Sequence, residues 1–407
     1  MQETPKGSRL HIAIFGRRNA GKSSLINALT NQDIALVSNV PGTTTDPVYK
    51  AMEILPIGPV MIIDTAGIDD IGDLGALRVE RTMQVLNKTD LAIIVIEPEL
   101  GLTAFEEQLA GEIKKRGLPV AGVINKWDLT PVPADVIENW SQSLALPLLN
   151  ISAKTGQGIE ELKRVMIKLA PDNWEGPPVI GDLVSPGDTV VLVVPIDLAA
   201  PKGRLILPQV QTIRDLLDND ACAVVVKERE LKEALEGLKQ APRMVVTDSQ
   251  EFMKVGADTP PGVQLTSFSI LMARHKGDLE TLVTGAKAIE SLEPGDKVLI
   301  SEGCTHHRQA DDIGRVKIPR WLRQSVGGEL DFEWFSGGSF PPNLAQYKLI
   351  VHCGACMLNR REMLYRLAMA REAGVPIVNY GLLIAHVHGI LHRALAPFPL
   401  AQMILDE

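Results

Sequence analysis

Three of the four cysteines lie in two short motifs in the last third of the chain. Cys304 and His306 form the first motif, and residues 352–356, His-Cys-Gly-Ala-Cys, form the second. Each motif directly follows a short apolar run, at 297–301 and 347–351, which predicts a strand. Ligands of open α/β sheets bind at the carboxyl ends of the strands. The pattern therefore predicts a ligand site that contains thiol side chains.

Thiolates bind both iron–sulfur clusters and zinc. Cys304, Cys353 and Cys356 can hold three irons of a cubane cluster, which leaves the fourth iron open to a weaker or exchangeable ligand. A zinc site needs a fourth strong ligand, which His306 or His352 can provide. The spacing leaves both metal sites open, and a redox pair of thiols is a third interpretation.

A second group of motifs lies in the first part of the chain. A predicted strand at 10–15 runs into Gly16-x-x-x-x-Gly21-Lys22-Ser23, and a helical run follows. This is a phosphate-binding loop in the strand–loop–helix context that it requires. Lys22 is expected to reach the β- and γ-phosphates and Ser23 to bind Mg²⁺. The residues expected to contact the nucleotide here are Gly16, Asn19, Ala20, Gly21, Lys22, Ser23 and Ser24.

Two polar segments follow the phosphate loop in the order that nucleotide hydrolysis requires. The loop at 42–46, with Thr44, is suited to close over Mg²⁺ and the γ-phosphate. Asp64 ends a predicted strand, and its carboxylate can hold Mg²⁺, while the N–H group of Gly67 can approach the γ-phosphate. We predict a catalytic group of Lys22, Thr44 and Gly67, and Mg²⁺ ligands Ser23, Thr44 and Asp64.

Two further motifs predict a guanine site. Residues 125–128, Asn-Lys-Trp-Asp, end a predicted strand, and the Asp128 carboxylate can accept hydrogen bonds from the N1–H and N2–H₂ groups of guanine. Adenine lacks these donors and would leave a buried charge unpaired. A Ser-Ala-Lys motif after the predicted strand at 146–151 is expected to lie behind the guanine base and contact it. The predicted base contacts are Asn125, Lys126, Asp128, Ser152, Ala153 and Lys154. Five motifs in this order predict GTP binding.

Composition limits the remaining possibilities. The chain of 407 residues is too long for one hydrophobic core, so about two to four domains are expected. No apolar run suggests a signal peptide or a membrane span, and four cysteines do not suggest a disulfide framework, so a cytoplasmic location is expected. The net charge of −9 argues against a nucleic-acid partner. Cys222, within the apolar run 221–226, is expected to be buried.

The predicted fold class is α/β, with a P-loop GTPase domain followed by two smaller α/β domains. The expected boundaries are 1–171 for the GTPase domain and 172–183 for a linker rich in Pro and Gly. Residues 184–264 alternate strands and helices and carry no clustered acid–base residues, which favours a subunit-contact or spacer domain. Residues 265–407 alternate in the same way and carry the cysteine motifs.

The motifs of residues 8–170 resemble GTPases of the TrmE–Era type. Ile68 stands where Ras-like proteins carry the glutamine that orients water, so intrinsic hydrolysis is expected to be slow. Asn19 matches an asparagine that helps to hold K⁺ in potassium-stimulated relatives, and a loop-stabilising amide is the alternative role. Arg17 and Arg18 are assigned no role.

With Cys-x-His, a long spacer and His-Cys-x-x-Cys added, the whole chain resembles HydF, the GTPase scaffold family of FeFe-hydrogenase maturation. This resemblance implies that Cys304, Cys353 and Cys356 ligate a 4Fe–4S cluster with one iron available. It implies a transient diiron precursor that radical-SAM hydrogenase maturases supply and apo FeFe-hydrogenase receives. It also implies a homodimer formed by the middle domain. His306 and His352 are either fourth ligands or supports of the strand ends.

The roles of other charged and imidazole side chains near the motifs are left undecided by the sequence. Glu302, Arg308, Arg360 and Arg361 are expected either to contact an anionic guest or to solvate the surface. A last helix is predicted at 382–395, and a structural role is favoured for its histidines, His386, His388 and His392. One alternative function is a TrmE/Era-like GTPase of tRNA modification or ribosome assembly with a structural metal domain, although no basic G-x-x-G loop of KH type is evident. A redox protein is another alternative, but it favours four cysteine ligands and only three are suitable.

Overall fold

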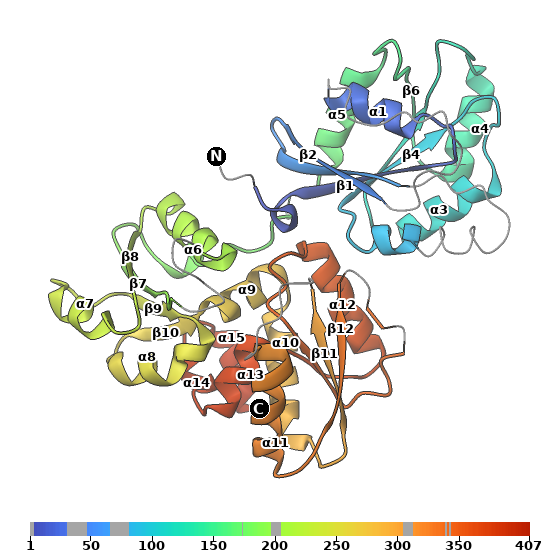
Figure 1. Cartoon of the computed structure of the whole chain (residues 1–407). Helices are drawn as coiled ribbons and strands as arrows, with labels where there is room; N and C mark the ends of the chain where they lie inside the picture. Colours follow the sequence, from blue (N-terminus) through green and yellow to red (C-terminus); the bar gives the residue numbers. More distant parts are fainter. Residues whose placement is uncertain are drawn as a thin grey trace. The chain divides into compact units, whose positions relative to one another are not determined.

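The computed structural model describes residues 4–30, 47–65, 81–172, 174–196, 205–303, 312–337, 340–341 and 343–407. The chain divides into two compact units, Met1–Glu175 and Gly176–Glu407, which are described separately (Figure 1). The division lies in the segment for which a linker was expected. Among the described residues, no helix is both long enough and apolar enough to cross a membrane.

The first unit is built on one sheet with the strand order β2-β3-β1-β4-β5-β6. Neighbouring strands are parallel except β2 and β3, which are antiparallel. Strands buried on both faces of a parallel sheet form continuous apolar runs, as β1 and β4 do. The strands are β1 (Leu10–Gly16), β2 (Val48–Ile54), β3 (Gly58–Asp64), β4 (Leu91–Ile96), β5 (Val120–Ile124) and β6 (Leu148–Asn150).

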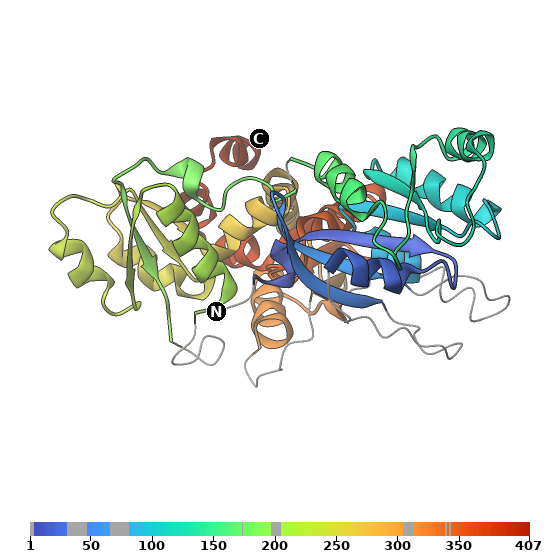
Figure 2. The same ribbon diagram turned by 90° about the horizontal axis from the view of Figure 1, so that it is seen from above.

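Helices cover both faces of this sheet (Figure 2). Successive side chains of a strand point to opposite faces. Ile12 and Ile14 therefore pack with α1 and α5, whereas Ala13 and Phe15 pack with α3 and α4. The helices are α1 (Lys22–Thr30), α3 (Ala104–Lys115), α4 (Ala134–Leu144) and α5 (Ile159–Leu169). The α/β class predicted from the sequence is confirmed.

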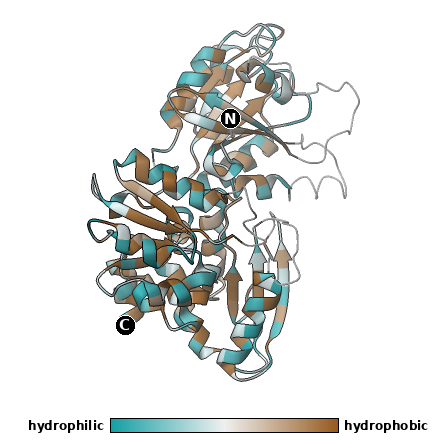
Figure 3. Ribbon diagram, turned by 60° about the vertical axis from the view of Figure 1, so that its left-hand side comes forward, coloured by the Kyte–Doolittle hydropathy of each residue, from teal (hydrophilic) through white to brown (hydrophobic). Residues whose placement is uncertain are grey.

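The second unit contains two parallel sheets, with the strand orders β10-β9-β7-β8 and β12-β11-β13-β14. Their buried apolar residues form one continuous hydrophobic cluster, and the strands accordingly are mostly brown in Figure 3. The first sheet contains β7 (Thr189–Val193), β8 (Cys222–Val226), β9 (Met244–Thr247) and β10 (Gln264–Ser267). The second contains β11 (Lys297–Glu302), β12 (Asp331–Ser336), β13 (Leu349–His352) and β14 (Ile377–Asn379).

Helices follow most strands of the second unit. Those of its first part are α6 (Leu207–Asp218), α7 (Leu231–Gly237), α8 (Phe252–Asp258) and α9 (Phe268–Lys276). Those of its second part are α10 (Leu279–Lys287), α11 (Ile318–Val326), α12 (Arg360–Glu372), α13 (Tyr380–Val387), α14 (Leu391–Ala394) and α15 (Pro399–Asp406). Asn359 caps α12 and Asn379 caps α13 through side-chain oxygens that accept hydrogen bonds from backbone N–H groups.

Two expectations from the sequence were wrong. The helical pattern of 382–395 predicts one helix, but the structure has two, because the chain turns at His388–Ile390 with Gly389 at a φ of 67°. The sequence also predicts a buried Cys222, but this thiol is exposed. Among the described residues β8 is an edge strand, and several of its apolar side chains are only partly covered.

Candidate functional site

The phosphate loop between β1 and α1 packs against the predicted base-binding motifs. The Asn125 amide donates a hydrogen bond to the Ala20 carbonyl oxygen at 2.9 Å, and its Oδ1 accepts one from Ala153 N at 3.0 Å. Gly21 lies so close that an added Cβ would be 2.2 Å from Asn125 Nδ2, and its φ is +87°. Only glycine fits this position without displacement of the amide. Three motifs that are distant in sequence thus meet around one buried amide.

Two oxygen ligands suitable for Mg²⁺, one from the start of α1 and one from the end of β3, lie side by side. Ser23 Oγ donates a hydrogen bond to Asp64 Oδ2 at 2.8 Å. Burial raises the pKa of Asp64, and the Ser23 hydrogen bond and the Lys22 charge oppose this shift. Lys22 Nζ is buried in the loop and donates to the carbonyl oxygens of Gly16 and Arg17, both at 2.8 Å. Because Mg²⁺ prefers oxygen ligands, the chemistry of this donor set fits the ion.

The predicted guanine-binding carboxylate is exposed and oriented by a serine. Asp128 Oδ1 accepts a hydrogen bond from Ser152 Oγ at 2.6 Å, and Ser152 Oγ also accepts one from Thr155 N at 3.2 Å. Lys126 forms an ion pair with Glu97, whose side chain is buried. The base-binding motifs therefore hold one another in place.

The phosphate loop also has an anchor that sequence reasoning missed. Arg17 Nε donates to Glu106 Oε1 at 2.9 Å and Arg17 Nη2 to the Gly101 carbonyl oxygen at 2.8 Å. Glu106 is fully buried in the first turn of α3, so Arg17 ties the loop to that helix. No motif in the sequence signals this pairing. Asn19, with a φ of 61°, and Lys154 are exposed.

Several predicted residues lie outside the described part of the chain. These are the switch and catalytic residues Thr44 and Gly67, the neighbouring Ile68, and the first cysteine motif with Cys304, His306 and Arg308. The roles expected for them stay predictions.

The register of the second sheet of the second unit places the strand end that precedes the first cysteine motif beside the second motif. β11 and β13 are parallel neighbours, with Ser301 opposite His352. Cys353 N donates a hydrogen bond to the Ser301 carbonyl oxygen at 2.9 Å, and Gly303 N donates to Cys353 Sγ at 3.1 Å. Cys304 is the residue after Gly303. The chain therefore enters the first motif directly beside the thiol of the second.

The loop after β13 carries the two described thiols of this site. Cys353 and Cys356 are both half-buried, and Ala355 between them has a left-handed φ of 53°. Lys276 Nζ donates to the carbonyl oxygens of Leu358 at 2.7 Å and Cys356 at 3.2 Å. Burial lowers the pKa of Lys276 to about 8, and the nearby Cys356 raises it. Among the described residues, no group of three or more His, Cys, Asp and Glu side chains is arranged to hold a metal ion.

His352 is fully buried behind this loop. Its Nδ1 is 2.8 Å from the Cys353 carbonyl oxygen and its Nε2 is 3.0 Å from Arg366 Nη1. Burial, followed by the Arg366 charge, lowers the pKa of His352 to about 3. A neutral ring that donates from Nδ1 and accepts at Nε2 satisfies both contacts. Of the two roles left open by the sequence, this geometry favours support of the strand end.

Arg366 is a buried cation that sequence reasoning missed. This α12 side chain is 1% exposed, forms an ion pair with Glu362 at 3.0 Å and lies 5.3 Å from the Phe340 ring centroid. It also donates to the Gly337 carbonyl oxygen at 2.9 Å. The i,i+4 spacing of Glu362 and Arg366 was the available signal, but such pairs usually lie on solvated helix faces.

Of the charged residues near the motifs, Glu302 is buried and Arg360 is half-buried. Glu302 is 5% exposed and accepts a hydrogen bond from Ser336 Oγ at 2.9 Å. Arg360 Nη1 donates to the carbonyl oxygens of His275 at 2.7 Å and Gly277 at 3.1 Å, and so caps the end of α9.

The Tyr380 hydroxyl is buried without a hydrogen-bond partner in the described residues, and burial with the Cys353 and Glu302 charges raises the pKa of Tyr380.

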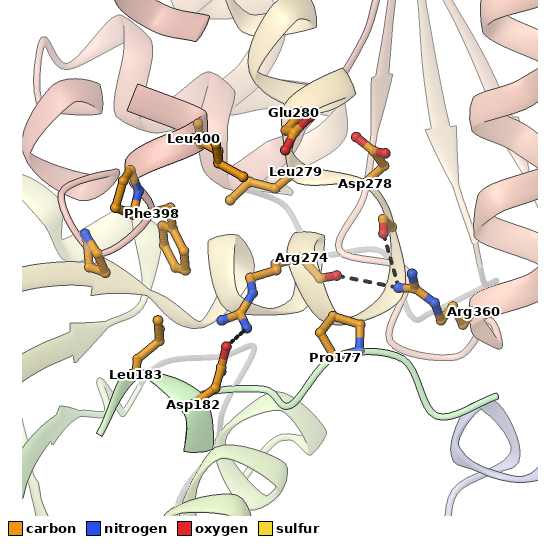
Figure 4. A pocket seen from close by; sticks show the side chains of 14 residues that line it. Pro177, Asp182, Leu183, Arg274, Asp278, Leu279, Glu280, Arg360, Phe398 and Leu400 are labelled. Carbon is orange, nitrogen blue, oxygen red and sulfur yellow. Dashed lines mark hydrogen bonds and ion pairs between the residues drawn. The ribbon is translucent and has the colours of Figure 1, made fainter. Parts of the chain in front are cut away.

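A cavity of about 390 Å³ lies beside Arg360 (Figure 4). Arg274 projects into it, forms an ion pair with Asp182 and lies 5.7 Å from the Phe398 ring centroid. The remaining lining residues are mainly apolar or acidic, and no described cysteine is among them. The cavity is therefore separate from the thiols of Cys353 and Cys356.

Three family models match this chain. One, described as 50S ribosome-binding GTPase, matches residues 11–126. The other two, described as hydrogen maturase F dimerization domain and tetramerization domain, match residues 179–277 and 280–397 and together cover more than half of the chain. The chain belongs to the hydrogen maturase F (HydF) family. Both cysteine motifs lie within the second HydF match, and α9 with Lys276 lies within the first.

Curated relatives of this HydF-family chain include GTPases with other names. GTPase Der of Wolinella succinogenes is 35% identical over 177 residues, which cover 42% of this chain and 37% of Der. The tRNA modification GTPase MnmE of Chromobacterium violaceum is 38% identical over 161 residues, which cover 39% of this chain and 34% of MnmE. The chain therefore spans about a third of the length of the curated relatives it matches. The HydF-family chain carries a GTPase domain.

Solved structures give a weaker likeness. Era of Aquifex aeolicus bound to GDP and AlF4⁻ has a TM-score of 0.37 and 21% identity, and the match covers 61% of this chain and 99% of Era. A bacterial selenocysteine-specific elongation factor has a TM-score of 0.33 and 23% identity, covering 41% of this chain and 30% of that protein. TM-scores this low support no conclusion about the fold or function of the HydF-family chain.

Proposed function

We propose that this protein is a GTP-hydrolysing scaffold and carrier that holds a 4Fe–4S cluster and a diiron precursor and delivers the precursor to apo FeFe-hydrogenase. The observation that carries the proposal is the register of β11 and β13, in which Gly303, the residue before the first cysteine motif, lies beside Cys353 of the second. The two HydF family models over the same unit support it. Radical-SAM maturases are the proposed source of the precursor.

The proposed cluster ligands are Cys304, Cys353 and Cys356. Thiolates are the usual protein ligands of iron–sulfur clusters, and three of them leave one iron able to take an exchangeable ligand. Gly303 N donates a hydrogen bond to the Cys353 sulfur. Hydrogen bonds to cysteine sulfurs help to set the reduction potential of a cluster. His306 is proposed near the open iron, whereas His352 supports the loop from behind.

The proposed nucleotide site follows from the contacts of the first unit. Lys22 is positioned to exchange its loop carbonyl partners for phosphate oxygens, and Ser23, Thr44 and Asp64 are the proposed Mg²⁺ ligands. Mg²⁺ when bound neutralises charge that develops on the phosphates. Asn125, Asp128 and the Ser152 motif are proposed to select guanine. Gly67 is proposed to contact the γ-phosphate.

A monovalent-cation role is proposed for Asn19, which is exposed at the phosphate loop. Hydrolysis of GTP is then expected to be slow and faster in potassium than in sodium at equal ionic strength. Steady-state phosphate release with each salt measures this. Equal rates in the two salts would remove the role of Asn19 and leave the nucleotide assignment intact.

The runner-up function, a GTPase of tRNA modification, is less well supported. Its basis is the identity to MnmE, which concerns about two fifths of this chain. The HydF family models account for most of the remaining sequence.

The carrier function is tested by transfer. Protein loaded with a diiron precursor by the maturases is mixed with apo FeFe-hydrogenase, and hydrogen evolution is measured. Wild-type protein is expected to activate the hydrogenase, and a Cys356→Ala variant is expected to fail, while a Cys222→Ala variant with an exposed thiol outside the motifs activates it normally. Equal activation by the wild-type and Cys356→Ala proteins would contradict the proposal.

A further inference from the structure

Lys276, the last residue of α9, is a buried charged side chain that contacts the Cys353–Leu358 loop. It is 2% exposed, whereas lysines are almost never fully buried unless they are paired. The loop that it contacts follows β13, about eighty residues later in the sequence. The sequence motifs gave no indication of this contact.

The ammonium group joins two carbonyl groups of that loop. Nζ is 2.7 Å from the Leu358 oxygen and 3.2 Å from the Cys356 oxygen. The loop cannot use β-ladder hydrogen bonds here, because β13 ends at His352 and α12 begins only at Arg360. A charged donor that binds two of its carbonyl groups therefore fixes the path of the backbone that carries Cys356.

The same group places a positive charge close to a proposed ligand. Nζ is 3.2 Å from the carbonyl oxygen of Cys356, the residue that carries the thiol. A cation buried at this depth carries a large desolvation cost unless negative charge lies close by. A cluster held by three thiolates carries net negative charge, which grows when the cluster is reduced.

We propose that Lys276 is a positioning residue of the cluster site, which holds the loop of Cys356 in its ligating conformation and stabilises the reduced cluster with its charge. This inference rests on the proposed cluster-binding function. It adds a residue from outside the cysteine motifs, and indeed from the part of the chain matched by the other HydF family model.

The test compares three variants after anaerobic reconstitution with iron and sulfide. Lys276→Met removes the charge and keeps the length, and Lys276→Arg keeps the charge. Lys287→Met is the matched control, because Lys287 Nζ also donates to a backbone carbonyl oxygen in this unit, that of Ile404 at 3.0 Å, far from the thiols in sequence. Iron and sulfide content, the electron paramagnetic resonance spectrum of the reduced cluster and its midpoint potential are measured.

Lys276→Met is expected to bind less cluster, and the cluster that it binds is expected to be harder to reduce. A tenfold change in the reduction equilibrium corresponds to about 59 mV for one electron, and a shift to lower potential of at least this size is expected. Lys276→Arg should restore much of the potential, and Lys287→Met should match the wild type. A lysine that only holds the loop would lower the cluster content of Lys276→Met without shifting the potential of the cluster that is bound, so the potential is the measurement that tests the charge.

A measurement without metal keeps the proposal testable if Lys276→Met takes up no cluster. In the apo protein, the alkylation rate of Cys356 is followed by mass spectrometry, with exposed Cys222 as the internal reference. Release of the loop is expected to raise the Cys356 rate relative to Cys222 at least several-fold in Lys276→Met but not in Lys287→Met.

The outcomes separate this proposal from the proposed function. A wild-type protein that forms no cluster overturns the proposed function and this inference with it. A wild-type cluster together with a Lys276→Met variant of unchanged content, potential and Cys356 alkylation overturns only the role of Lys276.

Discussion

His352 shows how burial decides the role of a side chain that its sequence position leaves open. As the residue before Cys353 it is a candidate ligand, but its two ring nitrogens face the Cys353 carbonyl oxygen and the Arg366 guanidinium group. A ring nitrogen that accepts a hydrogen bond from Arg366 uses its lone pair for that bond, so the lone pair is not available to a metal ion. The structure therefore favours a neutral imidazole that joins β13 to α12.

This role predicts a pH dependence of stability. The pKa of His352 is lowered to about 3, so between pH 6.5 and 3 the unfolded chain binds a proton that the folded chain does not. The free energy of unfolding should therefore fall with decreasing pH in this range, by up to about 1.4 kcal/mol per pH unit for this one group. His352→Gln should reduce that slope in urea unfolding of the apo protein.

The matched control is His392→Gln, since the His392 side chain is 68% exposed. It should leave the slope as in the wild type. If the His352→Gln and wild-type proteins lose stability in parallel on acidification, the neutral buried imidazole is refuted.

At the scale of elements, β8 carries the clearest consequence for assembly. Among the described residues it is an edge strand, and its Val225 is 45% exposed. Edge strands offer unpaired N–H and C=O groups to another chain, and lysine on an edge opposes such pairing. The family model over this region is described as a dimerization domain.

We therefore predict that Val225→Lys weakens the homodimer at least about tenfold, because a charge must be desolvated at the paired edge. Sedimentation analysis over a range of concentrations measures the dissociation constant. Leu217→Lys on α6 changes a side chain of similar exposure, 57%, that is not on an edge strand, and should dimerise normally. A Val225→Lys dimer as tight as the wild type would exclude β8 from the interface.

The sequence predicts elements of this fold better than it predicts their contacts. The apolar run at 297–301 lies within β11, and β13 begins two residues into the run at 347–351. Short β-branched segments that follow turn residues are typical of strands. α9 was not predicted, since its apolar residues surround the helix and it is almost wholly buried. Lys276 and Arg366 could not be assigned for a related reason: a buried charge is identified by its three-dimensional neighbours, not by its spacing.

At the scale of the whole molecule, the two chemistries lie in different units. The phosphate loop, Asp64 and the base motifs all belong to Met1–Glu175, which has its own sheet and two hydrophobic clusters. Units with their own cores can fold alone. We predict that residues 1–175 alone hydrolyse GTP at about the rate of the full chain and remain monomeric, as light scattering and phosphate release would measure.

A fragment that is folded by circular dichroism but inactive would show that the second unit completes the GTPase site. A fragment that dimerises as tightly as the full chain would remove the assembly role proposed for residues 184–264. Cysteine variants of the second unit should likewise retain GTP hydrolysis in the full chain, since none of the predicted nucleotide contacts lies there.

The central claim is that the ends of β11 and β13 hold a cluster through three cysteines with one iron left open. The most direct measurement is electron paramagnetic resonance of the reduced protein after anaerobic reconstitution, for the wild-type, Cys353→Ala and Cys222→Ala proteins. The wild type and Cys222→Ala are expected to give the same 4Fe–4S signal, which shifts when cyanide or imidazole is added, whereas Cys353→Ala is expected to lose it. A wild-type signal that no added ligand alters, or one that survives Cys353→Ala unchanged, would contradict the account.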